Sequence, residues 1–122
     1  MDYKRIRQSF KDAYKGVKYV YKNEQNFRVQ FFISVLVLAL MFFLNLSKGE
    51  IIVILFLVLL VLILELLNSA IEKFLDVIKP RMDLQVALVK DIMAAMVLLA
   101  STAALLIGLV VFLPHVIDLF RV

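Results

Sequence analysis

Residues 51–72 read IIVILFLVLLVLILELLNSAIE, and this stretch decides the fold. Every residue from Ile51 to Leu64 is apolar, which at 1.5 Å per helical residue covers only about 21 Å. The hydrocarbon core of a bilayer is about 30 Å thick, so a helix that crosses it here continues through Glu65 and Asn68 to about Ile71. The stretch therefore predicts a transmembrane helix with a carboxylate one to two turns inside the membrane.

Two further apolar blocks, Val29–Leu46 and Ile92–Leu113, are each close to the length of about 20 residues that a membrane span needs. Apolar residues make up 64% of the 122 residues, against about half in a globular domain. The first block follows a long polar segment and lacks a small-residue cleavage site, which argues against a cleaved signal peptide. We therefore expect one all-α membrane domain over residues 1–122, with spans at about 27–46, 50–78 and 86–113.

The segment before the first span is basic and amphipathic, and it holds eight of the 14 lysines and arginines. Its apolar residues recur at helical spacing: Ile6, Phe10, Ala13, Tyr14, Val17 and Tyr21. This pattern predicts a helix over about residues 4–23 that lies in the membrane interface, held by its apolar face and by anionic headgroups. No nucleic-acid-binding module is recognisable, so nucleic acid is not an expected partner.

The positive charges also predict an orientation. Lys79 and Arg81 lie between the second and third spans, whereas the first connector holds only Lys48 and the tail only Arg121. Positive loops stay in the cytoplasm, so the N-terminus and the second connector are predicted to be cytoplasmic.

The expected helix ends follow from local residues. The stretch 23–26, NEQN, is predicted to join the surface helix to the first span. Pro80 is predicted to end the second transmembrane helix, residues 79–85 to form a turn, and Asp83 to cap the third helix. Pro114 is predicted to close that third helix.

The second span carries an acidic stripe. Glu65, Asn68, Glu72 and Asp76 fall within a narrow strip of the helix at 100° per residue, and Ser69 borders it. A carboxylate inside a membrane costs about 2.5–3.5 kcal/mol on insertion scales and is a functional candidate. Three carboxylates also repel each other and require cations. Lysines could serve, but Mg²⁺ fits better, because it takes carboxylate oxygens and keeps other positions for phosphate and water.

Other elements add polar groups at the same predicted depth. Glu24 and Arg28 precede the first span, and Lys90 and Asp91 open the third. Metal-binding carboxylates, a phosphate-binding lysine and a more deeply placed base suit phosphoryl transfer. The chain has only three glycines and no Walker-type motif, so any nucleotide would be bound without a P-loop.

Depth in the membrane separates the predicted roles. Glu72 and Asp76 can reach water-borne ATP, whereas Glu65 can reach a lipid hydroxyl at the headgroup level. Simpler interpretations stay open: Glu65 could pair with a lysine of a neighbouring helix, and Glu72 and Asp76 could be an ordinary solvated helix end.

The residues of the stripe resemble a known family. Residues 65–72, ELLNSAIE, with Asp76 and residues 90–98, KDIMAAMVL, are similar to the signature of bacterial integral-membrane diacylglycerol kinases and undecaprenol kinases. Residues 23–28, NEQNFR, and Lys15-Gly16 match that family too. The resemblance implies a homotrimer in the bacterial inner membrane, with active sites shared between subunits, that uses ATP and Mg²⁺ to phosphorylate a lipid alcohol.

The resemblance also implies residue roles. Glu65 resembles the catalytic base that acts on the lipid hydroxyl, with Asn68 and Ser69 beside the substrate. Glu24 and Glu72 resemble carboxylates that bind Mg²⁺ and, through it, the nucleotide. Four further residues resemble nucleotide contacts: Arg5, Asp76, Lys90 and Asp91. Of these, Lys90 is expected on the phosphates.

Three positions depart from the family pattern. Gln30 stands where a histidine or an acidic residue is usual, Asp83 where a histidine is frequent, and Met96 where a small residue is expected. None removes a named catalytic group, although Met96 could alter close helix packing.

The stripe does not distinguish the two lipid alcohols. Diacylglycerol would give phosphatidic acid and undecaprenol would give undecaprenyl phosphate, and both present a primary hydroxyl at the interface. Two other classes remain as alternatives: a small cation- or proton-coupled transporter that uses Glu65, and a structural or regulatory membrane subunit.

Overall fold

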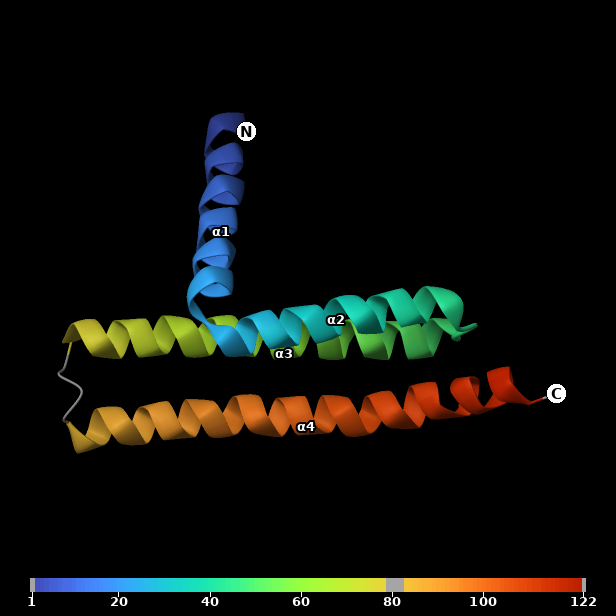
Figure 1. Cartoon of the computed structure of the whole chain (residues 1–122). Helices are drawn as coiled ribbons and strands as arrows, with labels where there is room; N and C mark the ends of the chain where they lie inside the picture. Colours follow the sequence, from blue (N-terminus) through green and yellow to red (C-terminus); the bar gives the residue numbers. More distant parts are fainter. Residues whose placement is uncertain (1, 79–82, 122) are drawn as a thin grey trace.

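The computed structural model describes residues 2–78 and 83–121, which form four helices. These are α1 (Tyr3–Asn23), α2 (Gln25–Phe43), α3 (Lys48–Ile78) and α4 (Leu84–Phe120). In Figure 1, α2, α3 and α4 run alongside each other, and α1 stands steeply off the start of α2, partway along α3 and α4. Helices α2, α3 and α4 are each long and apolar enough to cross a membrane. The predicted all-α membrane architecture is confirmed.

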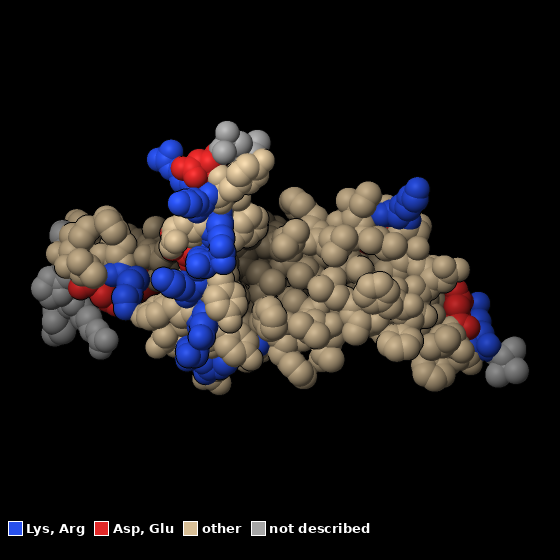
Figure 2. All heavy atoms as spheres, turned by 90° about the horizontal axis from the view of Figure 1, so that it is seen from above, with Lys and Arg blue, Asp and Glu red and all other residues tan. Residues whose placement is uncertain are grey.

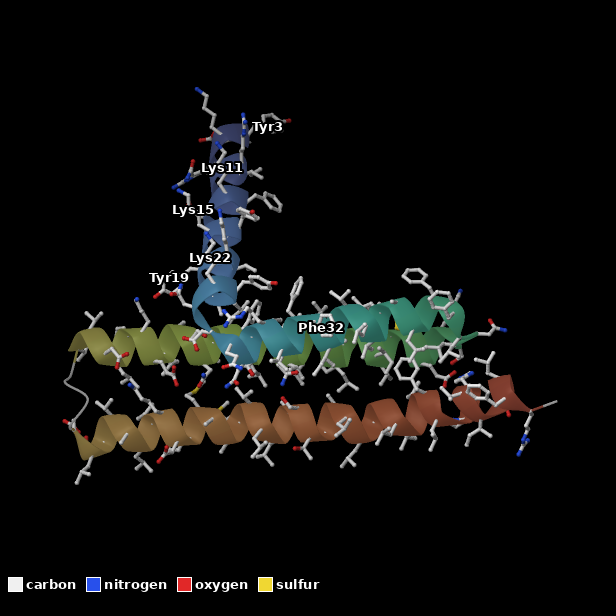
Figure 3. The ribbon with its side chains drawn as sticks, viewed as in Figure 1. Tyr3, Lys11, Lys15, Tyr19, Lys22 and Phe32 are labelled. Carbon is white, nitrogen blue, oxygen red and sulfur yellow. The ribbon has the colours of Figure 1, made fainter. Side chains whose placement is uncertain are left out.

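Helix α1 has the composition of an interfacial helix. Asp2 caps its N-terminus by accepting hydrogen bonds from the backbone N–H groups of Lys4 and Arg5 at 3.1 and 3.3 Å. Figure 3 shows Lys11, Lys15 and Lys22 along one side of the helix. In Figure 2 the basic side chains crowd over α1, and the long apolar body beyond it shows almost no charge. A steep angle between α1 and the spans suits a helix in the membrane interface.

A sharp corner joins α1 to α2 at Glu24. This residue has an extended backbone, with φ −115° and ψ 109°. The Nη1 atom of Arg28 donates to the carbonyls of Tyr21 and Lys22, each at 2.9 Å. These carbonyls belong to the last turn of α1, where helix partners run out. Arg28 therefore stabilises the corner and holds Glu24 at the base of the spans.

Helices α3 and α4 form an antiparallel pair joined at both ends. The Nζ of Lys90 lies 2.7 Å from Oδ1 of Asp76. At the opposite end, Nε2 of His115 lies 3.1 and 3.2 Å from the carboxylate oxygens of Glu50. We call the end with the Asp76–Lys90 bridge the polar end, and the end with the Glu50–His115 bridge the far end. The two bridges are 26 residues apart on α3 and 25 on α4, so the helices keep nearly one-to-one register.

The packed core is small and lies at the far end. Leu44, Ile54 and Phe112 form a buried cluster, with Met41 and Val116 among the side chains packed against it. Elsewhere large apolar side chains are exposed along α2, α3 and α4. Exposure on this scale fits helices that face lipid or other chains rather than water.

The predicted helix ends are correct only in part. The joint between α1 and α2 is Glu24 alone rather than residues 23–26, and α2 ends at Phe43 rather than at residue 46. Asp83 caps α4 as predicted, accepting from the backbone N–H of Gln85 at 2.8 Å. Helix α4 therefore begins at Leu84, before the end of the predicted 79–85 turn. Pro80 lies outside the described residues.

Pro114 does not close the third span, because α4 continues through it to Phe120. Proline removes one helical N–H donor, but its fixed φ is compatible with a helix. Beyond the proline, His115 bonds to Glu50 and Val116 packs against the far-end cluster. These contacts hold the last turns of α4 in place.

Candidate functional site

Glu65 lies on the buried face of α3 and is only 4% exposed. The buried residues of this helix recur every three or four positions, and Val61 and Ser69 lie one turn to either side of the carboxylate. The rest of the stripe becomes more accessible toward the polar end. Asn68 and Glu72 are half-buried, and Asp76 is exposed.

Two further carboxylates lie within electrostatic range of Glu65. Glu24, from the α1–α2 corner, and Glu72, two turns along α3, are each close enough to Glu65 to repel its negative charge. Within residues 2–78 and 83–121, none of the three forms an ion pair. Glu24 therefore lies within electrostatic range of Glu65 in the fold. The alternative in which a lysine neutralises Glu65 is not found within this part of the chain.

Asn68 adds an unpartnered acceptor to the cluster. Its Oδ1 atom is buried and receives no hydrogen bond from the described residues. A buried acceptor without a donor costs about 1–3 kcal/mol. A hydroxyl group on a bound molecule would supply the missing hydrogen bond.

Ser69, on the same buried face as Glu65, borders α1. It lines a cavity of about 440 Å³ between α1 and α3, together with Gly16, Val20 and Lys73. The ammonium of Lys73 donates to the hydroxyl of Tyr19 and lies 4.8 Å from the centre of its ring. This tie between α1 and α3 was not predicted, because no local pattern links residues that far apart in sequence.

Of the predicted nucleotide contacts, three lie on α3 and α4 at the polar end, and the fourth, Arg5, lies on α1. Asp76 and Lys90 are joined by the bridge at 2.7 Å, with side chains 41% and 28% exposed, so both are accessible. Asp91 is exposed. Val20 is the buried residue of α1 and lies beside α3. Arg5 lies in the first turn of α1, fifteen residues and about 22 Å along the helix from Val20. The fold of a single chain therefore leaves Arg5 away from Glu65.

A second cavity, of about 460 Å³, lies between α2, α3 and α4 on the far-end side of Glu65. Val61, one turn from Glu65 on the same face of α3, forms part of its wall. Most of the lining is apolar, with polar side chains from Gln30, Ser34 and Ser101. A hydrocarbon chain is the kind of ligand that such a lining favours.

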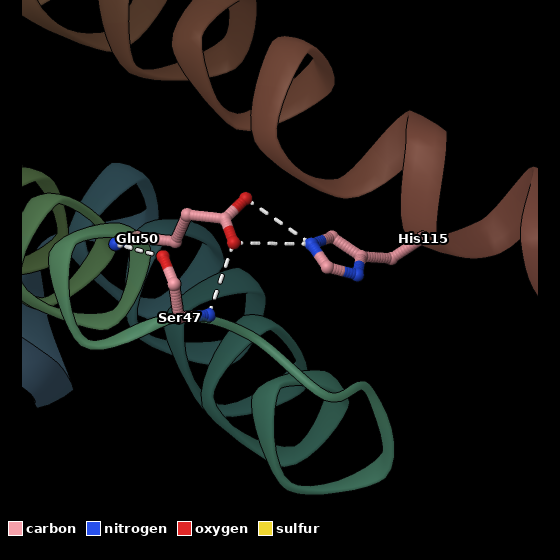
Figure 4. Close-up of polar contacts among 3 residues, drawn as sticks. All are labelled: Ser47, Glu50 and His115. Atoms are coloured by element: carbon pink, nitrogen blue, oxygen red, sulfur yellow. Dashed lines mark hydrogen bonds and ion pairs between the residues drawn. The ribbon is translucent and has the colours of Figure 1, made fainter.

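The far end carries a polar cluster that sequence reasoning missed (Figure 4). The N–H of Ser47 donates to Oε1 of Glu50 at 3.0 Å, and the N–H of Glu50 donates to Oγ of Ser47 at 3.2 Å. This is a capping box at the start of α3, and its S-x-x-E spacing is visible in the sequence. The partner of Glu50 across the bundle, His115, had no such signal.

The predicted metal ligands do not form a complete metal site among the described residues. In the part of the chain that the structure describes, no three or more Asp, Glu or His side chains are close enough to hold a metal ion. Glu24 and Glu72 could therefore supply only part of a Mg²⁺ coordination shell. Mg²⁺ is usually held this way, by one or two carboxylates with water and substrate phosphates completing the shell.

The sequence is similar to that of known proteins. The family model for prokaryotic diacylglycerol kinase matches residues 11–112. A diacylglycerol kinase of Synechocystis sp. is 36% identical over 112 residues, covering 91% of this chain and 64% of that protein. A diacylglycerol kinase of Haemophilus influenzae is 46% identical over 68 residues, covering 56% of this chain and 58% of that protein.

The matches span less than two-thirds of the length of either relative. The family model, however, matches most of this chain and contains every residue of the acidic stripe, Glu24, Lys90 and Asp91. The chain therefore belongs to the prokaryotic diacylglycerol kinase family.

Proposed function

We propose that this protein is a lipid kinase that transfers the γ-phosphate of ATP to the primary hydroxyl of a membrane lipid alcohol. The observation that carries the proposal is Glu65, a buried carboxylate without a cationic partner in the described chain, flanked by Glu24 and Glu72. Membership of the family supports a lipid substrate. Both relatives are named for diacylglycerol, which makes this lipid the first candidate and undecaprenol the second.

Glu65 would act as general base. The lipid hydroxyl approaches its carboxylate, and Oδ1 of Asn68 can accept a hydrogen bond from the same hydroxyl before the proton moves. As Glu65 takes the proton, the hydroxyl oxygen attacks the γ-phosphorus and the bond to the leaving oxygen of ADP breaks. The products are a lipid phosphate monoester and ADP.

Glu24 and Glu72 would hold Mg²⁺, which when bound neutralises charge on the nucleotide phosphates. Lys90 would contact those phosphates from α4. Its ammonium is bonded to Asp76 at 2.7 Å, so a phosphate would compete with that carboxylate or join it at the same ammonium.

The remaining nucleotide contacts point to an assembly. Arg5 lies far along α1 from the carboxylate cluster of its own chain. If Arg5 contacts the nucleotide, it does so most simply in the site of a neighbouring copy. We therefore propose a homotrimer with shared sites, whose polar end faces the cytoplasm of a bacterial cell at its inner membrane.

One assay tests the proposed activity. The purified full-length chain, in detergent micelles with Mg²⁺ and ATP labelled at the γ-phosphate, is offered diacylglycerol and undecaprenol in separate reactions. We expect labelled lipid from at least one alcohol and none after chelation of Mg²⁺. Glu50→Gln is a matched control, since it alters a carboxylate of the same helix at the far end and should retain activity. Absence of product from both alcohols would overturn the proposal.

The transporter alternative requires Glu65 but gives no role to the Asp76–Lys90 bridge at the polar end. The comparisons give it no support.

A further inference from the structure

The cavity between α2, α3 and α4 contains a polar group that the proposed transfer does not use. Nε2 of Gln30 donates to Oγ of Ser101 at 3.0 Å, which links α2 to α4 across the cavity wall. The other lining residues are mainly aliphatic, including Val58 and Val61. A polar pair in such a lining is either a structural tie or part of a binding site.

The register of α3 and α4 places this pair at the depth of Glu65. Glu65 lies eleven residues from Asp76 along α3, and Ser101 lies eleven residues from Lys90 along α4. Because Asp76 and Lys90 are bonded and the helices are antiparallel, both positions lie about 16 Å from the bridge. The Gln30–Ser101 pair and the carboxylate thus occupy one level of the bundle.

The cavity extends from this level toward the far end. On α3 its wall runs from Val61, one turn from Glu65, to Ile54. On α4 it runs from Ser101 to Phe112, a rise of about 16 Å. A lipid whose hydroxyl lies at Glu65 would therefore place a hydrocarbon chain along this wall, with its first few atoms beside Gln30 and Ser101.

The pair retains free hydrogen-bonding capacity. The hydroxyl of Ser34 donates to the main-chain carbonyl oxygen of Gln30 at 2.7 Å, so the hydroxyl proton of Ser34 is not available to a ligand. The hydroxyl proton of Ser101 and the second amide N–H of Gln30 have no acceptor among residues 2–78 and 83–121. Two donors are thus available on the cavity wall at the level of the reactive carboxylate.

The two candidate lipids differ at this position. In diacylglycerol an ester carbonyl lies within a few bonds of the free hydroxyl, and a carbonyl oxygen accepts hydrogen bonds. In a polyprenol the atoms that follow the hydroxyl are hydrocarbon and accept none. A site built to hydrogen-bond its substrate discriminates against an analogue that lacks the matching group, because the polar groups of the site are left unpaired.

Building on the proposed lipid kinase activity, we infer that Gln30 and Ser101 bind an ester carbonyl of the substrate, and that this contact selects ester-linked diacylglycerol over polyprenol. The cavity between α2, α3 and α4 then holds the acyl chain of that ester. Gln30 and Ser101 are specificity residues in this scheme and take no part in the transfer of the phosphate.

The test compares lipids that differ only in the carbonyl. The full-length chain in mixed micelles with MgATP is offered a diacylglycerol, the dialkyl ether of the same chain lengths and stereochemistry, and a polyprenol. One hydrogen bond corresponds to roughly tenfold in kcat/KM, so we expect the ester to be used about ten times better than the ether. Ser101→Ala removes one of the two donors and should lower this ratio, mainly by lowering kcat/KM for the ester.

Thr102→Ala is the matched control, because Thr102 is the adjacent hydroxyl residue on α4 and is exposed. It should leave the ester-to-ether ratio unchanged. Equal use of ester and ether by the unaltered chain, or better use of the polyprenol, would overturn the inference while leaving the kinase activity intact. An equal loss with both lipids in Ser101→Ala would assign the pair a structural role and also overturn it. Failure to phosphorylate any of the three alcohols would overturn the proposed activity itself.

Discussion

The local environment of Glu65 differs from that of Glu24 and Glu72, and the difference suits one group to proton transfer and the others to metal binding. Glu65 is buried next to an unpartnered amide oxygen of Asn68, whereas Glu72 is half-buried and Glu24 lies at the open α1–α2 corner. A deep carboxylate suits proton transfer at a lipid hydroxyl, and accessible carboxylates suit a hydrated cation. Substitutions at these positions should therefore have different kinetic effects.

Replacing Glu65 by Gln keeps the shape of the side chain and removes its ability to take a proton. We expect phosphate transfer to fall by 10²- to 10⁴-fold, the usual contribution of a general base, while the affinity for MgATP stays within about twofold. Single-turnover transfer and equilibrium binding of nucleotide measure the two quantities. Loss of nucleotide binding together with normal transfer at saturating ATP would contradict the assigned role.

Replacing Glu72 by Gln should act on the metal instead. Loss of one of two carboxylate ligands is expected to raise the Mg²⁺ concentration needed for half-maximal activity by about tenfold or more, with partial recovery at high Mg²⁺. A titration of activity with Mg²⁺ at fixed ATP measures this shift. Glu50→Gln, at the far end of the same helix, should leave the Mg²⁺ dependence unchanged. An unaltered titration curve in Glu72→Gln would remove Glu72 from the metal site.

At the scale of elements, the α1–α2 corner depends on one side chain. Arg28 bonds to two carbonyls of the last turn of α1, and hydrogen bonds from charged groups contribute about 1.5–3 kcal/mol each when well shielded and less when partly exposed. Arg28→Met should loosen the corner, so that amides of residues 20–26 exchange at least several-fold faster with deuterium. Lys22→Met removes a positive charge from the same turn without losing these bonds and should not change the exchange. Equal exchange in both variants would show that other contacts hold the corner.

The helix ends show which features can be predicted from sequence. Asp83 was predicted as a cap because capping chemistry involves only the next few residues, and its bond to Gln85 confirms this. Pro114 was predicted to end α4, and this was wrong. The turns beyond Pro114 are held by the bond between His115 and Glu50, two residues that are 65 positions apart in the chain. No local pattern contains that information.

In the candidate site, too, features set by local sequence were predicted and features set by distant residues were not. Glu65, Glu72 and Asp76 were placed on one face because helical spacing is periodic, and the structure confirms Glu65 on the buried face of α3. The convergence of Glu24 on the cluster was expected from shared depth, and the charge repulsion between these carboxylates agrees with it. The bond between Gln30 and Ser101 was not predicted, because it depends on the rotation of two helices about their axes.

At the scale of the whole molecule, the bridges at the two ends define how α3 and α4 pair within one chain. The sequence has no cysteine, so Glu50→Cys with His115→Cys creates a single pair of thiols. A short bismaleimide should join them within one chain, giving a product that still migrates as a monomer on a denaturing gel. Glu50→Cys with Leu99→Cys is the control, because Leu99 is 71% exposed and lies sixteen residues, or about 24 Å, from His115 along α4, and should react poorly. A crosslinked dimer as the main product would show that α4 pairs with α3 of another copy.

The continuation of α4 through Pro114 makes the spans unequal in length. Helix α4 has 37 residues and is about 55 Å long, whereas α2 has 19 residues and is about 28 Å long. A bilayer with its headgroups is about 40–45 Å thick, so α4 must tilt or project from it. Because α3 is bonded to α4 at both ends, the two helices tilt together. If Glu65 acts as proposed, membrane thickness sets the level at which it meets the headgroups, and hence which lipid hydroxyls come within its reach.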